Sequence, residues 1–182
     1  KEYFFPVFGG IVGGLAVSSN LWIILMPFSL AILWNEFEKE LSTFMWGGAF
    51  ILVSHSWILS LHPLTWIGFS WVNSLVITIL IWLLCSFLGG VLVTTWGQIG
   101  KKILSKDLIL NQNGFQTLIR VFFMSLTWAF GELILTQTSF FWIGISESLI
   151  PGDLYIAGLA RWIGSLGVCS LQLFIGFLVF YI

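Results

Sequence analysis

Long apolar segments separated by short polar breaks dominate the chain. A helix that crosses a bilayer needs about 20 largely apolar residues, and the pattern predicts six such helices, over residues 4–17, 21–34, 42–61, 70–96, 117–136 and 154–182. The first two are short or tilted and form a hairpin at the polar residues 18–20. The sequence therefore predicts an all-α, polytopic membrane helix bundle, with residues 1–182 as one transmembrane domain.

Charged residues and a proline mark the ends of the predicted helices. Glu36, Glu38, Lys39 and Glu40 form the first charged break, and a polar stretch over residues 97–116 follows the fourth helix. Pro63 interrupts the chain after the third helix, because proline lacks a backbone N–H and biases the residue before it away from helix. These breaks predict that the fourth helix ends near residue 96.

Composition agrees with a bilayer environment. Hydrophobic residues make up 58% of the chain and charged residues 8%, whereas soluble domains carry about a quarter charged residues. A soluble surface is therefore excluded. The net charge of −1 provides no basic face, which excludes nucleic acid as a partner, and membrane lipids are the expected surroundings.

The basic residues predict a cytoplasmic N-terminus, because Lys and Arg are retained on that side of a membrane. With six helices, the outer segments carry no Lys or Arg apart from Arg161, a few residues into the sixth helix. The cytoplasmic segments carry all the others: Lys1, Lys39, Lys101, Lys102, Lys106 and Arg120.

Ionisable groups inside a membrane are costly, so each is a candidate functional residue. A rise of about 1.5 Å per residue places Glu132 about 18 Å beyond Arg120, and Arg161 about 12 Å inside the outer end of its helix. One hypothesis is that Glu132 and Arg161 form an ion pair or flank a polar cavity open to the outer leaflet. The alternative is that they are unrelated residues whose side chains reach water. For His55 a hydrogen bond between helices is preferred to a proton relay. The outer boundary carries further candidates: His62, Glu147 and Asp153.

Small and aromatic residues give two packing predictions. Four glycines on the first helix, Gly9, Gly10, Gly13 and Gly14, give small-xxx-small pairs at which helices can approach closely. Tryptophans are predicted to lie mostly in aromatic belts at the membrane interfaces, and His62 with Trp66 and Trp71 is predicted to anchor an interfacial loop. The belt prediction covers Trp22, Trp34, Trp46, Trp57, Trp82, Trp96, Trp128, Trp142 and Trp162.

The residues contain no identifiable catalytic or metal-binding set. A zinc site needs several His or Cys close together, and two of each are dispersed along this chain. Cys85 and Cys169 lie in apolar runs without the electropositive setting of a reactive cysteine, and are expected to be lipid-facing or packed thiols. No cofactor is expected, and ligation of a tetrapyrrole by His55 or His62 is disfavoured.

Four stretches, in order along the chain, resemble the apolipoprotein N-acyltransferase family, especially its cyanobacterial form. Residues 56–68 resemble the third helix and outer loop of that family, and residues 128–135 resemble its Trp-x-x-x-Glu-x-x-Arg helix. Residues 141–148 resemble its aromatic outer loop, and residues 159–164 the next helix. The chain departs from the family at Leu135, where the family has Arg, and in Ser139-Phe140-Phe141-Trp142, where it has Gly-Phe-Pro-Trp.

The resemblance implies a membrane enzyme of the bacterial plasma membrane. Such an enzyme transfers an acyl chain from a phospholipid to the N-terminal cysteine of a lipoprotein, using a Glu-Lys-Cys triad in an outer nitrilase-like domain. These 182 residues contain no such domain, so the chain is expected to be the membrane module alone, as a fragment or a truncated homologue. The implied substrate-binding residues are Glu132, Arg161, His62, Trp66 and Trp142.

A second interpretation stays open beside the first. The chain is then a non-catalytic integral membrane subunit or scaffold of a larger complex, which binds lipid or pigment in the plasma membrane or in an internal membrane of a photosynthetic bacterium. A transporter is disfavoured, because the sequence lacks the paired half-helices and inner-half polar groups expected near the bilayer midplane.

Overall fold

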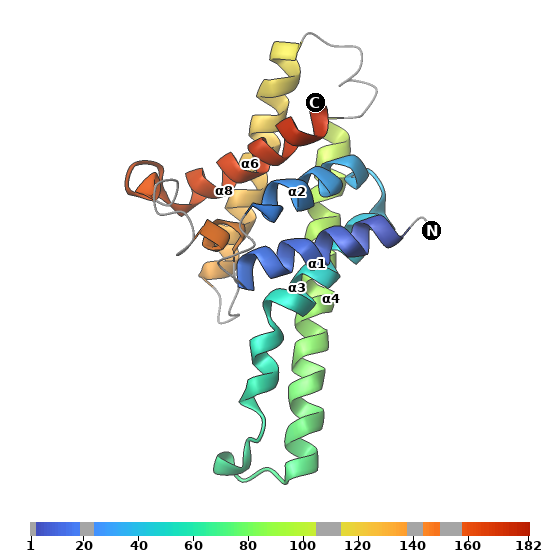
Figure 1. The fold of residues 1–182 in the computed structure, drawn as a ribbon, viewed down its shortest axis with the longest axis vertical. Helices are drawn as coiled ribbons and strands as arrows, with labels where there is room; N and C mark the ends of the chain where they lie inside the picture. The colour runs from blue at the N-terminus through green and yellow to red at the C-terminus, as the bar shows by residue number, and fades with distance from the viewer. Residues whose placement is uncertain (1–2, 19–23, 105–113, 138–143, 150–157) are drawn as a thin grey trace.

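The computed structural model describes residues 3–18, 24–104, 114–137, 144–149 and 158–182 as an assembly of helices, and contains no strand among them (Figure 1). This confirms the predicted all-α membrane helix bundle. The described parts of the connections contain the short 3-10 helices η2 (Ser56–Leu61), η3 (Thr65–Ile67) and η4 (Ile145–Leu149). The α-helices are α1 (Phe4–Ser18), α2 (Leu25–Glu36), α3 (Glu40–Ser54), α4 (Trp71–Ile103), α6 (Gly114–Thr136) and α8 (Ala160–Tyr181).

Helix length separates these elements into two groups. In the described part of the chain, α4, α6 and α8 are long and apolar enough to cross a membrane. The apolar helices α1 and α3 have 15 residues each, about 22 Å at 1.5 Å per residue, against a hydrocarbon core of about 30 Å. In α3 the shortfall is made up by η2, which continues the helical path after a break at His55.

Two helix boundaries differ from the sequence prediction. The fourth helix does not end near residue 96 but continues to Ile103. Phe37 packs against this extension where Gly97 and Gly100 carry no side chain, and the lysines of its last turn complement the helix dipole. The predicted third helix is divided, because α3 ends at Ser54 before η2 begins. Residues 21–23 and 154–157, at two other predicted boundaries, lie outside the described residues.

Glycines bring α1 and α3 into close contact, as predicted. A Cβ atom at Gly10 would overlap the backbone oxygen of Trp46, and one at Gly14 would lie 2.6 Å from the Cβ atom of Val53. Gly89 of α4 is packed in the same way against Ile51. The helices can therefore approach to backbone contact only because these positions carry no side chain.

Four tryptophans lie in the core rather than in interfacial belts, so the belt prediction was wrong for Trp34, Trp46, Trp96 and Trp128. Their rings meet edge to face, with ring centres 5.1 Å apart for Trp34 and Trp96 and 5.2 Å apart for Trp96 and Trp128. A buried indole N–H needs an acceptor. Trp34 donates to the Leu173 carbonyl of α8 at 2.9 Å, and Trp96 to the Met124 carbonyl of α6 at 3.0 Å. Indole hydrogen bonds thus join helices across the core.

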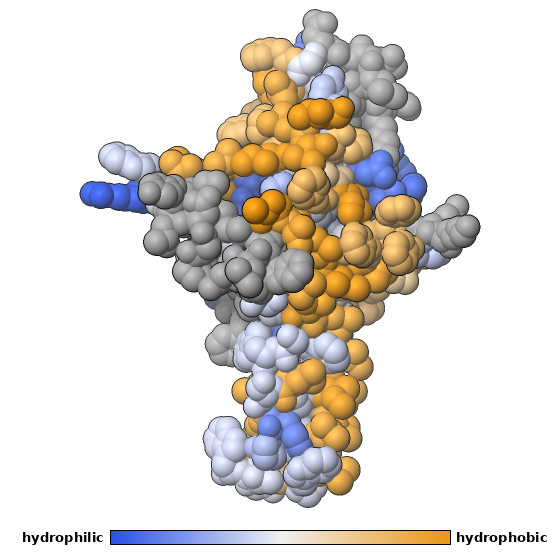
Figure 2. Space-filling model, viewed as in Figure 1, coloured by the Kyte–Doolittle hydropathy of each residue, from blue (hydrophilic) through white to orange (hydrophobic). Residues whose placement is uncertain are grey.

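The two ends of the molecule differ in charge and shape. The first half of α4 runs beside η2 and, with η3, forms a leg (residues 56–81) that projects beyond the other helices (Figure 1). At the opposite end Thr94 donates to the Glu40 carbonyl, and Arg120 donates to the Ile103 carbonyl. These bonds bring Lys39, Lys101, Lys102 and Arg120 to the same end of the molecule, and the membrane side that this end faces stays a prediction. Apolar side chains cover much of the face seen in Figure 2.

Candidate functional site around Glu132

Glu132 is a buried carboxylate inside a membrane helix. Its side chain is 7% exposed, and its Oε1 atom accepts a hydrogen bond from the Trp128 Nε1 atom at 2.8 Å. The two residues lie four apart on α6, so they share one face of the helix. The same oxygen accepts the backbone N–H of Ile145 at 2.9 Å, and the thiol of Cys169 on α8 is a further hydrogen-bonding neighbour. These contacts compensate a group that is costly in a membrane.

The segment from Gly144 to Ser148 is fixed on α6 and α8 by these contacts and by a second set. Gly144 lies against the other oxygen of Glu132, since a Cβ atom there would be 2.7 Å from Oε2. Ser148 donates to the Ile145 carbonyl at 2.7 Å and accepts from the Gln172 Nε2 atom of α8 at 3.0 Å. We call Trp128, Glu132, Gly144, Ile145 and Cys169 the Glu132 cluster. It joins the connection between α6 and α8 to these two membrane helices.

A cavity of about 150 Å³ lies between α4 and α6 beside this cluster. Trp96 and Val93 of α4 and Trp128 and Leu135 of α6 line it, and Glu132 is also part of the lining. Leu92 and Ile99, also in its lining, are exposed on the helix surface, so the cavity opens sideways. An apolar cavity that opens on a bilayer suits an alkyl chain.

Known proteins match the chain from end to end. It is 54% identical over 182 residues to the apolipoprotein N-acyltransferase of Prochlorococcus marinus subsp. pastoris. It is 42% identical over 185 residues to the protein of that name in another strain of Prochlorococcus marinus, and 36% identical over 170 residues to the one in Parasynechococcus marenigrum. The chain belongs to the apolipoprotein N-acyltransferase family.

The match covers only part of each relative. The alignments include 100%, 100% and 93% of this chain but 37%, 37% and 35% of the three relatives, and they correspond to the N-terminal part. No protein-family model matches the chain. No solved structure matches it.

Arg161 lies away from the Glu132 cluster, although it is on α8, the helix that also carries Cys169. Its side chain is exposed at the start of α8, with the guanidinium carbon 5.9 Å from the centre of the Trp162 ring. Gly164, with φ 68° and ψ 174°, interrupts the helical path between Arg161 and Cys169. Among the contacts of the described residues, none joins Arg161 to Glu132. Their pairing in this acyltransferase relative stays a prediction.

His62 and Trp66 lie at the tip of the leg. The His62 Nδ1 atom is 2.9 Å from the Ser74 hydroxyl, which also accepts the Leu64 N–H at 2.7 Å. The His62 ring meets Trp71 edge to face at 4.8 Å, and Trp66 is 79% exposed. His62 therefore ties the loop to α4 and leaves Trp66 on the surface. Trp142, the last predicted site residue, lies outside the described residues.

No site for a metal ion is formed by three or more His, Cys, Asp or Glu side chains in the described part of the chain. His55 is buried at the end of α3, with its Nδ1 atom 2.9 Å from the Ser54 hydroxyl. Cys85 and Cys169 are free thiols, as expected. The sequence prediction missed Gln172, which the cost of polar groups in a membrane could have indicated, as it did for Glu132.

Proposed function

We propose that the chain is the membrane module of an apolipoprotein N-acyltransferase-like protein. In the whole protein it supports transfer of an acyl chain from a phospholipid to the N-terminal cysteine of a lipoprotein. The names of the relatives and the identity over the full length of this chain support the reaction class. Because the chain spans 37% of the length of the first relative, the acyl-transfer chemistry is assigned to the part of such a protein outside these residues, in the bacterial plasma membrane.

The buried Glu132 carboxylate carries this proposal. It holds the connection between α6 and α8 next to an apolar cavity that opens on the bilayer. The cavity accepts part of an acyl chain, and the Glu132 cluster fixes the outer segment past which the lipid headgroup moves. Trp66 on the leg contacts the membrane surface, and Trp142 is a further lipid-binding candidate from the sequence. His62 holds the leg tip, and Arg161 at the start of α8 attracts the lipid phosphate.

Acyl transfer by the full-length gene product tests the proposal. The native reading frame is expressed in a strain depleted of its own apolipoprotein N-acyltransferase, and the N-terminal acylation of a lipoprotein is measured by mass spectrometry. Restored acylation supports the proposal. Ile99→Trp, which narrows the cavity from its exposed side, is expected to reduce acylation at least several-fold, whereas the exposed control Ile119→Trp is not.

Two outcomes would overturn the proposal. The first is a reading frame that ends at Ile182, with no acylation by the product in membranes that contain phospholipid and lipoprotein. The chain would then be a non-catalytic membrane subunit. The second is acylation by the full-length product that Ile99→Trp leaves unchanged, although the variant is present at the level of the parent protein, which would remove the cavity from the lipid path.

A further inference from the structure

α8 is kinked one turn after it begins. Gly164 has φ 68° and ψ 174°, which are not helical angles, and separates the first turn from the long part of the helix. This conformation belongs to a region of backbone space that is essentially restricted to glycine. The first turn closes on one acceptor, because the N–H groups of Trp162 and Ile163 both donate to the Leu159 carbonyl, at 2.8 and 3.0 Å. We call residues 159–163 the α8 arm.

A second glycine completes the kink. A Cβ atom at Gly167 would lie 2.5 Å from the Cβ atom of Ile163, whereas residues four apart on a continuous helix keep their Cβ atoms about 5–6 Å apart. The Ile163 side chain therefore lies over the Gly167 backbone, in a position that a continuous helix does not give it. Gly164 changes the path of the backbone, and Gly167 makes room for the last side chain of the arm. We call these two glycines the joint.

Burial changes at the joint. In the arm, Trp162 is 81% exposed and Ile163 is 49% exposed, whereas Val168, Cys169 and Leu173 beyond the joint are all buried. Segments with few buried contacts open and move more readily than the core to which they are attached. The joint therefore lies between a part of α8 that is packed in the bundle and a part that is not.

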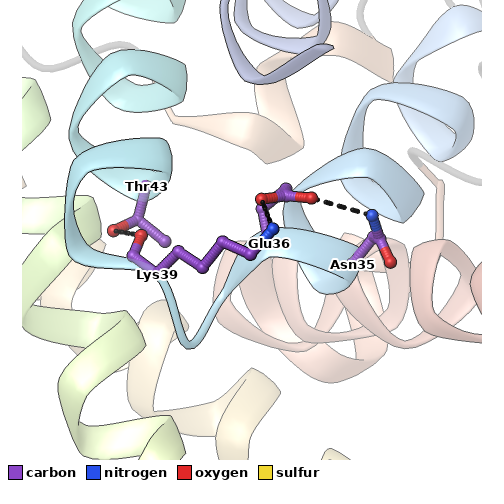
Figure 3. A network of polar contacts seen from close by, with 4 residues as sticks. All are labelled: Asn35, Glu36, Lys39 and Thr43. Atoms are coloured by element: carbon purple, nitrogen blue, oxygen red, sulfur yellow. Dashed lines mark hydrogen bonds and ion pairs between the residues drawn. The ribbon is translucent and has the colours of Figure 1, made fainter. Parts of the chain in front are cut away.

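The connection between α2 and α3 shows how this chain fixes a change of direction elsewhere (Figure 3). The Glu36 carboxylate accepts a hydrogen bond from the Asn35 amide at 2.9 Å and pairs with the Lys39 ammonium at 2.9 Å. The Thr43 hydroxyl donates to the Lys39 carbonyl at 3.1 Å, so side chains of both helices hold that connection. Among the described residues, no side-chain hydrogen bond or ion pair joins the α8 arm to another element, and the arm depends on the joint for its direction.

We propose that the joint allows the α8 arm to change direction while the long part of α8 stays packed. Arg161 and Trp162 move with the arm, and Cys169 remains beside Glu132. In a continuous helix the same movement would reach Cys169, because eight residues span only about 12 Å of rigid helix. Cationic and aromatic side chains are typical of a membrane surface, so the joint lets this pair follow that surface without disturbing the Glu132 cluster. This role does not depend on acyl transfer.

Distances between spin labels on the purified full chain test the proposal. The background is Cys85→Ser with Cys169→Ser, which keeps a hydrogen-bond donor at the second position. One label is attached at Gln98→Cys, on the exposed side of α4, and the other at Trp162→Cys in the arm or at Phe130→Cys, an exposed position in the middle of α6. Double electron–electron resonance in detergent is expected to give a distance distribution about twofold broader for Trp162→Cys than for Phe130→Cys, because the arm has few buried contacts.

Gly164→Ala identifies the joint as the cause. Alanine disfavours the backbone angles of Gly164, so the arm is expected to continue the helix, and the Trp162→Cys distances become narrower and shift. A label at Leu178→Cys, in the long part of α8, is expected to keep its distances in the same variant. Gly158→Ala is the matched control, because no neighbouring atom lies within 4 Å of the position that its Cβ atom would take, and it is expected to change neither label.

If Gly164→Ala fails to fold, the comparison of Trp162→Cys with Phe130→Cys in the parent protein decides. Equal widths at these two sites would show that the arm is as rigid as α6 and would overturn the proposal. Trp162→Cys distances that a folded Gly164→Ala variant leaves unchanged would do the same. A shift of the Leu178→Cys label as large as that of the Trp162→Cys label would also overturn it, because α8 would then move as one body.

Discussion

The Glu132 carboxylate on α6 accepts the backbone N–H of Ile145 at 2.9 Å, so this side chain ties the connection that leads toward α8 to α6. Glu132 also holds the Trp128 indole, and Trp128 is in contact with Trp46 and Trp96. The connection between α6 and α8 and the aromatic core are therefore linked through one acidic residue, and a change at either end of this link is expected to alter the stability of the bundle.

Replacement of Glu132 by Ala is expected to destabilise the protein strongly. The Trp128 and Ile145 N–H groups would both lose their acceptor, and each unpaired buried group costs about 1–3 kcal/mol. Glu132→Gln keeps an acceptor oxygen in a side chain of the same shape and is expected to lose much less stability. Thermal unfolding in detergent compares the two. Equal midpoints for Glu132→Ala and Glu132→Gln would show that these hydrogen bonds contribute little.

Gly144→Ala is expected to disturb the Glu132 cluster without changing any polar group. The added Cβ atom would lie 2.7 Å from the Glu132 Oε2 atom, and overpacking of this kind typically costs about 1–3 kcal/mol. Gly131→Ala is the matched control, because no neighbouring atom lies within 4 Å of the position that its Cβ atom would take and alanine favours helix over glycine. A lower unfolding midpoint is expected for Gly144→Ala alone. A lower midpoint in both variants would contradict the view that overpacking against Glu132 causes the loss of stability.

Much of the architecture could be predicted from the sequence, because long apolar segments identify membrane helices wherever their side chains point. The glycine contacts of α1 could also be predicted, because the spacing of Gly10 and Gly14 alone places both on one face of a helix. The core positions of Trp34 and Trp96 were missed, because hydropathy does not distinguish a buried indole from an interfacial one. The cost of a buried charge indicated Glu132, but its partner Ile145 contributes a backbone group that no sequence pattern marks.

Trp96→Phe is expected to destabilise the bundle although it keeps an aromatic ring. The Met124 carbonyl of α6 would lose the indole donor that lies 3.0 Å away, and the smaller ring would leave a gap beside Trp34 and Trp128. Trp162→Phe serves as the control, because Trp162 is 81% exposed. The two variants are compared by thermal unfolding in the same detergent. Similar midpoints in both variants would mean that neither the indole hydrogen bond nor the larger ring of Trp96 contributes to stability.

The thiol of Cys169 reports on the contacts between α6, α8 and η4. Cys169 is 1% exposed beside Glu132, so in a Cys85→Ser background we expect slow maleimide labelling of the folded protein and full labelling after denaturation. Gln172→Leu removes the hydrogen bond to Ser148 and is expected to speed labelling, because the segment that covers the cluster then loses its side-chain hydrogen bond to α8. Gln98→Leu, at an exposed position of α4, controls for the loss of an amide. Labelling of Gln172→Leu at the rate of the parent would show that the Ser148 contact does not help to close the site.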